Sequence, residues 1–261
     1  MKERVLTAIV LLLVVIGALF FDPTGWAVKV LVFLIVLTCG VELGKLTKAA
    51  SIYGLPAMGF ILLGFAKYSS TEWAVNALVG LVCSVGLYFG IEKKSESIKV
   101  IFGSLWILSS CIALYALSST KSPATWPLLM TAAIPIWCGD TAAIFVGKAF
   151  GKHKLAPSIS PNKTWEGSIG NLLACVGAAL VLGAIFHYPM LLMVLLGLNC
   201  GILGQAGDLF ESWLKRKADV KDSGNILPGH GGLLDRLDSL MATAPLSLLI
   251  LQSLVVPGTP K

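Results

Sequence analysis

Residues 208–239 read DLFESWLKRKADVKDSGNILPGHGGLLDRLDS, and long apolar segments stand on both sides of this run. The run gathers acids, bases, a histidine and glycines in a chain of which 56% is hydrophobic and only 13% is charged. Polar groups next to membrane-length apolar segments are costly, and they are retained where they carry function. The run therefore predicts a functional site at a membrane boundary, with helices before and after it.

The apolar surplus of the 261-residue chain comes in long runs, and its mean hydropathy is +0.84. A helix that crosses the hydrocarbon core needs about 20 apolar residues. We therefore predict an all-α fold, a polytopic integral membrane helix bundle with about nine transmembrane helices. The predicted spans are residues 4–21, 26–47, 52–67, 72–90, 98–118, 126–149, 167–187, 190–217 and 233–256. The first is taken as a retained span and not as a cleaved signal peptide.

Lysines and arginines predict the orientation, because they gather on the cytoplasmic side of a membrane. With nine spans and a cytoplasmic N-terminus, all of them lie inside except Lys29, Lys67, Lys121 and Lys261. This places loops 150–166 and 217–232 in the cytoplasm of a multi-pass cell membrane protein, in bacteria the inner membrane. The net charge of +6 is thus explained without nucleic acid. Residues 1–120 carry little chemistry and predict a scaffold, whereas residues 121–261 predict the catalytic part.

Two acids interrupt predicted spans. Asp140 falls inside span 126–149, where an aspartate faces a protein interior, a cavity or a cation; the alternative is an aspartate that caps a helix restarting after Gly139. Glu42 falls near the inner end of span 26–47. We interpret it as a snorkelling or helix-paired residue, with a role in the site as the less favoured alternative.

The loop at 151–167, GKHKLAPSISPNKTWEG, joins lysines and hydroxyls to a helix that restarts near Trp165. Free N–H groups at a helix start bind anions, so this segment predicts a phosphate cradle. The alternative is a basic loop that only follows the charge rule for cytoplasmic loops. The segment has no Walker P-loop pattern.

Helical spacing divides the run at 208–239. Asp208, Ser212 and Lys215 share one helix face, and Asp235 and Asp238 share another after the glycine-rich turn. Oxygen ligands from two helices suit Mg²⁺ bridged to substrate phosphates; interhelical ion pairs are the alternative. His230 can act as a general acid or base, or it can organise the turn. The residues thus predict a cytoplasm-facing, metal-dependent site for phosphorylated ligands, one of them a lipid.

The sequence also resembles the phosphatidate cytidylyltransferases, or CDP-diacylglycerol synthases. The resemblance covers about residues 135–245. Its signature is filled by Ser212, Lys215, Arg216, Lys221, Asp222, Gly224, Leu227, Pro228, His230, Gly231, Gly232, Asp235, Arg236 and Asp238. Asp140-Thr141 and residues 158–167 look like the nucleotide-side motif of the family, with Asn162 as a small departure. The resemblance implies that CTP and phosphatidate give CDP-diacylglycerol and pyrophosphate, for phospholipid biosynthesis.

The resemblance also implies roles. Asp208 and Asp235 lead the expected metal ligands, with Asp238 and Asp140 as further candidates for Mg²⁺ and for a second cation. The expected catalytic residues are Asp208, Asp235, Lys215, Arg236 and His230. The expected substrate-binding residues are Ser160, Pro161, Lys163, Thr164, Glu166, Ser212, Arg216, Lys221 and Asp222. Two other functions stay open: a CTP-dependent lipid kinase and a phospholipid transporter. The sequence does not give the oligomeric state, although small residues on membrane helices favour pairing, which leaves a homodimer open.

Overall fold

The computed structural model describes residue 10 and residues 13–21, 26–49, 91, 93–119, 127–227 and 231–254. Its described part is mostly helical. The elements are α2 (Trp26–Thr47), α5 (Glu96–Ser119), α6 (Leu128–Phe150), β1 (Lys154–Ala156), β2 (Ser160–Thr164), α7 (Trp165–Phe186), α8 (Met190–Lys217), α9 (Leu234–Leu251) and a short 3₁₀ helix, η2 (Gln252–Leu254).

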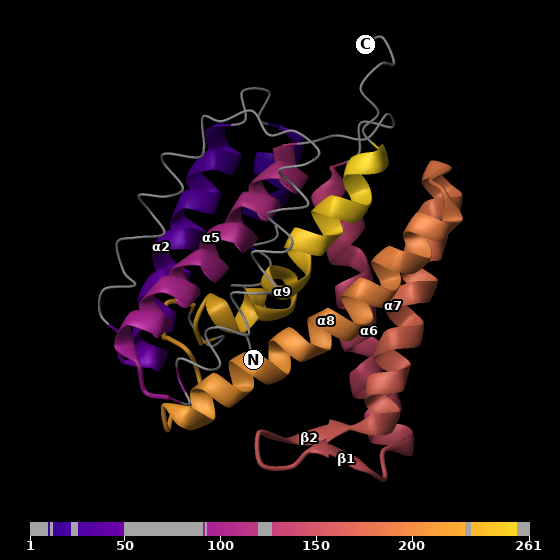
Figure 1. Ribbon diagram of the computed structural model, residues 1–261. Helices are drawn as coiled ribbons and strands as arrows, with labels where there is room; N and C mark the ends of the chain where they lie inside the picture. The colour runs from indigo at the N-terminus through magenta and orange to yellow at the C-terminus, as the bar shows by residue number, and fades with distance from the viewer. Residues whose placement is uncertain are drawn as a thin grey trace.

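The described helices form two groups, which α9 connects (Figure 1). Helices α2 and α5 lie side by side, and α6 and α7 form a second pair with α8 packed against α7. Helix α9 contacts both α5 and α8. The long helix α8 runs diagonally, and its C-terminal end reaches below α2 and α5, while the β1–β2 hairpin lies under α6 and α7 (Figure 1). The end of α8 and the start of α9, which hold most of the predicted site, therefore meet near the first helices of the chain.

Five of the described helices are long and apolar enough to cross a membrane: α2, α5, α6, α7 and α8. The chain is therefore a multi-pass membrane protein. The predicted spans 52–67 and 72–90 lie outside the described residues, and α9 is not among the five, so the count of about nine is not confirmed. The prediction for α8 was accurate at both ends, because Pro189 precedes its first residue and a charged last turn ends it.

The segment at 150–166, predicted as a loop, contains an antiparallel hairpin instead. Strands β1 and β2 pair Lys154 with Thr164 and Ala156 with Ser160. The Glu166 carboxylate accepts hydrogen bonds from the backbone N–H groups of Lys152 and His153 and lies 2.7 Å from His153 Nδ1. The sequence did not reveal this pairing because the strands are short and lack alternation of polar and apolar residues.

Glycines let α7 and α8 approach closely. A Cβ atom on Gly197 would lie 2.5 Å from the Cα atom of Val176, and one on Gly201 would lie 2.6 Å from the side chain of Leu172. Between membrane helices, small residues of this kind permit the backbone contact that drives association. The site residues on α8 thus keep a fixed position relative to α7.

We expect Gly197→Ala to destabilise the protein by about 1–3 kcal/mol, since overpacking here meets backbone atoms. Gly177→Ala is the matched control on α7, because its Cβ atom would have open space; alanine in place of glycine in a helix is favourable by up to about 1 kcal/mol. Thermal unfolding in detergent measures both variants. Equal unfolding temperatures for the two would contradict the packing argument.

Helix α9 contains Pro245, which has no N–H to donate to the carbonyl of Met241. The hydroxyl of Ser110 on α5 donates to that carbonyl at 2.9 Å. On the other side of α9, the side-chain amide of Asn199 on α8 donates to the carbonyl of Thr243 and the hydroxyl of Ser247. These buried hydrogen bonds hold α9 between α5 and α8.

Candidate active site

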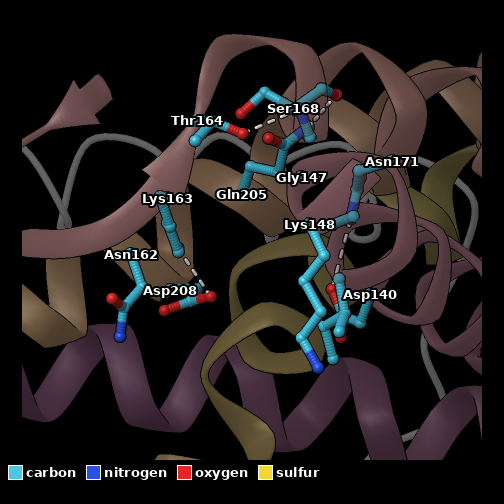
Figure 2. Close-up of a pocket in the computed structure, with 13 residues that line it drawn as sticks. Asp140, Gly147, Lys148, Asn162, Lys163, Thr164, Ser168, Asn171, Gln205 and Asp208 are labelled. Atoms are coloured by element: carbon cyan, nitrogen blue, oxygen red, sulfur yellow. Dashed lines mark hydrogen bonds and ion pairs between the residues drawn. The ribbon is translucent and has the colours of Figure 1, made fainter. Parts of the chain in front are cut away.

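A cavity of about 630 Å³ opens between α6, β2, α7 and α8 (Figure 2). Its polar lining includes Asp140, Lys148, Lys163, Asn171 and Asp208. Of the other predicted substrate-binding residues, Thr164 lines it as well, while Ser160, Pro161 and Glu166 do not. The structure therefore brings Asp140, Lys163, Thr164 and Asp208 together at one cavity and leaves Ser160, Pro161 and Glu166 outside its lining.

Lys163 and Asp208 form the ionic centre of the cavity, with Lys163 Nζ 2.6 Å from Asp208 Oδ2 (Figure 2). Within the described part of the chain, the buried ammonium of Lys163 makes no hydrogen bond besides this ion pair. An ammonium has three protons to donate. Lys163 therefore retains donors that are available to a phosphate or another anion in the cavity.

Asp140 lies on the opposite wall, where Asn171 Nδ2 donates to its Oδ1 at 3.2 Å (Figure 2). Helix α6 runs without interruption through Gly139 and Asp140, so the alternative of a cap at a helix restart is wrong. Gly139 instead allows α7 to approach closely, since a Cβ atom there would clash with Cys175 Sγ. Asp140 is thus an acid inside a span that faces a cavity.

A second cavity, of about 240 Å³, has mainly apolar walls from residues 15–19, α2, α5, α6 and α9. Its polar lining includes Asp140, Arg236 and Asp238. Asp140 lines both cavities. The carboxylates of Asp140, Asp208 and Asp238 are near enough to one another and to Lys163 for their charges to interact. A polar cavity and an apolar cavity therefore meet at a cluster of acids.

Asp235 lines neither of these two cavities. Its Oδ1 accepts from Lys215 Nζ at 2.7 Å, and its Oδ2 accepts from the backbone N–H groups of Ser223 and Gly232. Lys215 also contacts the buried carboxylate of Glu211 at 2.6 Å. Asp208 and Lys163 thus share one cavity that Asp235 does not line, and the alternative of interhelical ion pairs describes Asp235 and Lys215.

The phosphate cradle predicted at the start of α7 has fewer free donors than expected. The N–H of Trp165 donates to the carbonyl of His153, and the N–H of Gly167 donates to the Thr164 hydroxyl, which caps the helix. Both groups are thereby occupied. Anion binding in this region would depend on the side chain of Lys163 and not on the helix start.

The remaining predicted residues flank the site. Ser212 donates to Asp208 at 3.4 Å, and Arg216 donates to the carbonyl of Ile159 on the hairpin. Lys221 and Asp222 are exposed in the turn between α8 and α9. His230 lies outside the described residues, so its role stays a prediction.

Asn171 was not among the predicted site residues, and for Glu42 a role in the site was the less favoured alternative. Asn171, only 3% exposed, holds Asp140. Glu42, only 1% exposed, accepts hydrogen bonds from the turn before α9. The sequence contains a signal for Glu42, because an acid within an apolar span indicates a functional position. The same rule singled out Asp140.

Among the described residues, no three histidine, cysteine or acidic side chains converge to hold a metal ion by themselves. Mg²⁺ is often held by one or two carboxylates together with substrate phosphates. Asp208 and Asp140, which face one cavity beside a lysine with free donors, fit that pattern. Asp235 fits it less well, because both its oxygens already accept hydrogen bonds.

Comparison with known proteins gives consistent matches along the chain. The profile of the Cytidylyltransferase family matches residues 2–254. The phosphatidate cytidylyltransferase of Staphylococcus epidermidis is 35% identical over 97% of this chain and 100% of that protein. Proteins of the same name from Staphylococcus aureus and Bacillus subtilis are 35% and 34% identical, over 97% and 94% of this chain and 100% and 95% of their own lengths.

Proposed function

Because the chain belongs to the cytidylyltransferase family, we propose that it is a phosphatidate cytidylyltransferase. It transfers CMP from CTP to phosphatidate and releases pyrophosphate, so that CDP-diacylglycerol becomes available for phospholipid synthesis. The observation that carries this proposal beyond the family is the meeting of a polar and an apolar cavity at Asp140. A reaction between a soluble nucleotide and a membrane lipid requires such a junction.

The two cavities suggest where each substrate binds. Lys163 supplies buried ammonium donors in the larger, polar cavity, which suits the triphosphate of CTP. The apolar cavity suits the chains of a lipid, and Arg236 at its polar lining suits the phosphatidate phosphate. The reacting groups then meet beside Asp140 and Asp238.

The transfer needs little proton chemistry. A phosphate oxygen of phosphatidate forms a bond to the α-phosphorus of CTP, and the bond from that phosphorus to the oxygen shared with the β-phosphorus breaks. The lipid phosphate is already ionised near neutral pH, so a strong base is not required. Alignment and charge neutralisation by Lys163 and Arg236 therefore provide most of the catalysis. His230 is then better assigned to the turn or to a phosphate contact than to a base.

Mg²⁺ is part of the proposal, with Asp208 and Asp140 as the leading ligands and Asp238 as a further one. Bound there with phosphate oxygens, the ion would neutralise charge that builds up on the leaving pyrophosphate. We also propose that the N-terminus and the site face the cytoplasm, where CTP is found, as the distribution of lysine and arginine favours. The homodimer stays a prediction.

Labelled CTP in mixed micelles with phosphatidate tests the function. We expect the label of the α-phosphate to enter the lipid and the label of the γ-phosphate to leave with pyrophosphate, in a reaction that EDTA stops and Mg²⁺ restores. Entry of the γ-label alone would instead identify a lipid kinase. Without incorporation of either label, the transferase proposal fails and a transporter becomes the better reading.

A further inference from the structure

Glu42 reaches from α2 into the segment that precedes α9. Its side chain is buried at 1% exposure. Oε1 accepts from the backbone N–H of Leu233 at 3.0 Å, and Oε2 accepts from the N–H of Leu234 at 2.7 Å and from the hydroxyl of Ser223 at 3.1 Å. One carboxylate from the predicted scaffold thus binds both ends of the turn between α8 and α9.

Helix α9 has no cap from its own sequence. Leu233 occupies its N-cap position and makes no side-chain hydrogen bond. Helix starts leave N–H groups unpaired, and a nearby carboxylate stabilises them and interacts well with the helix dipole. Glu42, which lies 191 residues before Leu233 and 192 before Leu234 in the chain, takes this role. These donors are therefore used for holding α9 and not for holding a substrate phosphate.

The glycines of the turn make room for this carboxylate. A Cβ atom on Gly224 would lie 2.5 Å from Glu42 Oε1, and one on Gly232 would lie 2.7 Å from the same atom. Gly224 and Gly232 thus leave space for the Glu42 carboxylate, and at Gly232 a Cβ atom would also clash with the Ser223 hydroxyl.

Glu42 and Asp235 hold the turn from two sides. The Ser223 hydroxyl lies 3.1 Å from Glu42 Oε2 and 3.0 Å from Asp235 Oδ2, and Gly232 N–H donates to Asp235 Oδ2 at 2.8 Å. The first turns of α9 carry Arg236 and Asp238, which line the apolar cavity. The start of α9 therefore fixes where these two side chains stand.

We propose that Glu42 is a positioning residue for the transfer reaction, which holds the start of α9 so that Arg236 and Asp238 face the reacting phosphates. This inference rests on the function proposed above. It gives the N-terminal half of the chain a part in catalysis, although Glu42 touches neither substrate. Within the described part of the chain, Glu42 bonds to Ser223, Leu233 and Leu234, whereas Lys163 and Asp208 on the CTP side pair with each other.

The main test is Glu42→Gln, which keeps the shape but turns one acceptor oxygen into an NH₂ group that faces N–H and O–H donors. We expect kcat to fall about 100-fold, which is the order of loss that a small misplacement of reacting groups causes. The KM for CTP should stay within about twofold, because the residues proposed to bind CTP in the ground state are unchanged. Ser110→Ala, which removes another buried hydrogen bond to α9, is the control for stability alone and should keep kcat.

A double-mutant cycle sharpens the test. Gly224→Ala forces a Cβ atom against the Glu42 carboxylate, so it should lower kcat in the wild type but have little further effect once Glu42→Ala has removed that carboxylate. If the losses of kcat in Gly224→Ala and Glu42→Ala simply multiply in the double variant, the inference is overturned. An unchanged kcat in Glu42→Gln would also overturn it, and so would a change in the KM for CTP alone.

Two further outcomes are distinguishable. If Glu42→Gln does not fold, Ser223→Ala, which removes one hydroxyl donor, takes its place: a lower kcat at constant KM supports the inference, and an unchanged kcat overturns it. If the wild-type protein itself incorporates no α-label, the proposed function fails, and the role of Glu42 in it fails for that separate reason.

Discussion

Asp208→Asn is expected to lower the rate of CMP transfer by about 10³-fold, the upper range for loss of one preorganised electrostatic group at a reacting centre. Asp208 Oδ2 lies 2.6 Å from Lys163 Nζ, and both residues line the polar cavity. Asparagine keeps the size of the side chain but removes the charge that holds the ammonium and, as we propose, Mg²⁺. The rate of α-label transfer from CTP into lipid measures the effect.

The control is Asp219→Asn, the same chemical change on an exposed residue at the end of α8. Asp219 has a left-handed backbone (φ 58°), which asparagine also tolerates, so this variant should keep full activity. The Mg²⁺ concentration for half-maximal rate gives a second measurement and should rise in Asp208→Asn. Activity near that of the wild type in Asp208→Asn would remove Asp208 from the centre of the site.

Lys215→Met is expected to have the largest effect on stability. Its ammonium contacts Glu211 at 2.6 Å and Asp235 at 2.7 Å, and the side chains of these acids are 1% and 5% exposed. Removal of one partner of a buried ion pair costs about 3–5 kcal/mol, because a charge stays behind without compensation. At about 2–4 °C per kcal/mol for a chain of this size, the unfolding temperature should fall by about 10 °C.

Lys217→Met is the matched control, since Lys217 is exposed in the same helix turn and lies over the ring of Trp213. A cation–π contact at an exposed site is worth about 0.5–1 kcal/mol, so this variant should unfold only slightly earlier than the wild type. The double variant Glu211→Gln/Lys215→Met should recover part of the lost stability, because it buries one charge fewer. If Lys215→Met and Lys217→Met unfold together, the three charges do not act as a buried unit.

The structure gives different surroundings to Asp208 and Asp235, two acids with the same expected role. Asp208 and Asp235 were both expected to be leading metal ligands, on the basis of the family resemblance. In the structure, Asp208 faces a cavity and a lysine with unused donors, whereas Asp235 is enclosed by Lys215 and two backbone N–H groups. Sequence spacing places residues on a helix face, but it does not show which neighbour that face meets.

The amino-acid sequence alone indicated a multi-pass membrane protein, its family and a set of candidate site residues, because apolar runs and a long motif are local signals. Tertiary structure decided how these residues divide into an ionic cavity and a buried ion-pair cluster. It also decided that Glu42 caps α9 and that Gly224 and Gly232 leave space for it. The physical reason is that such contacts join residues far apart in the chain, and helical periodicity predicts which face a side chain occupies but not the distant group that the face meets.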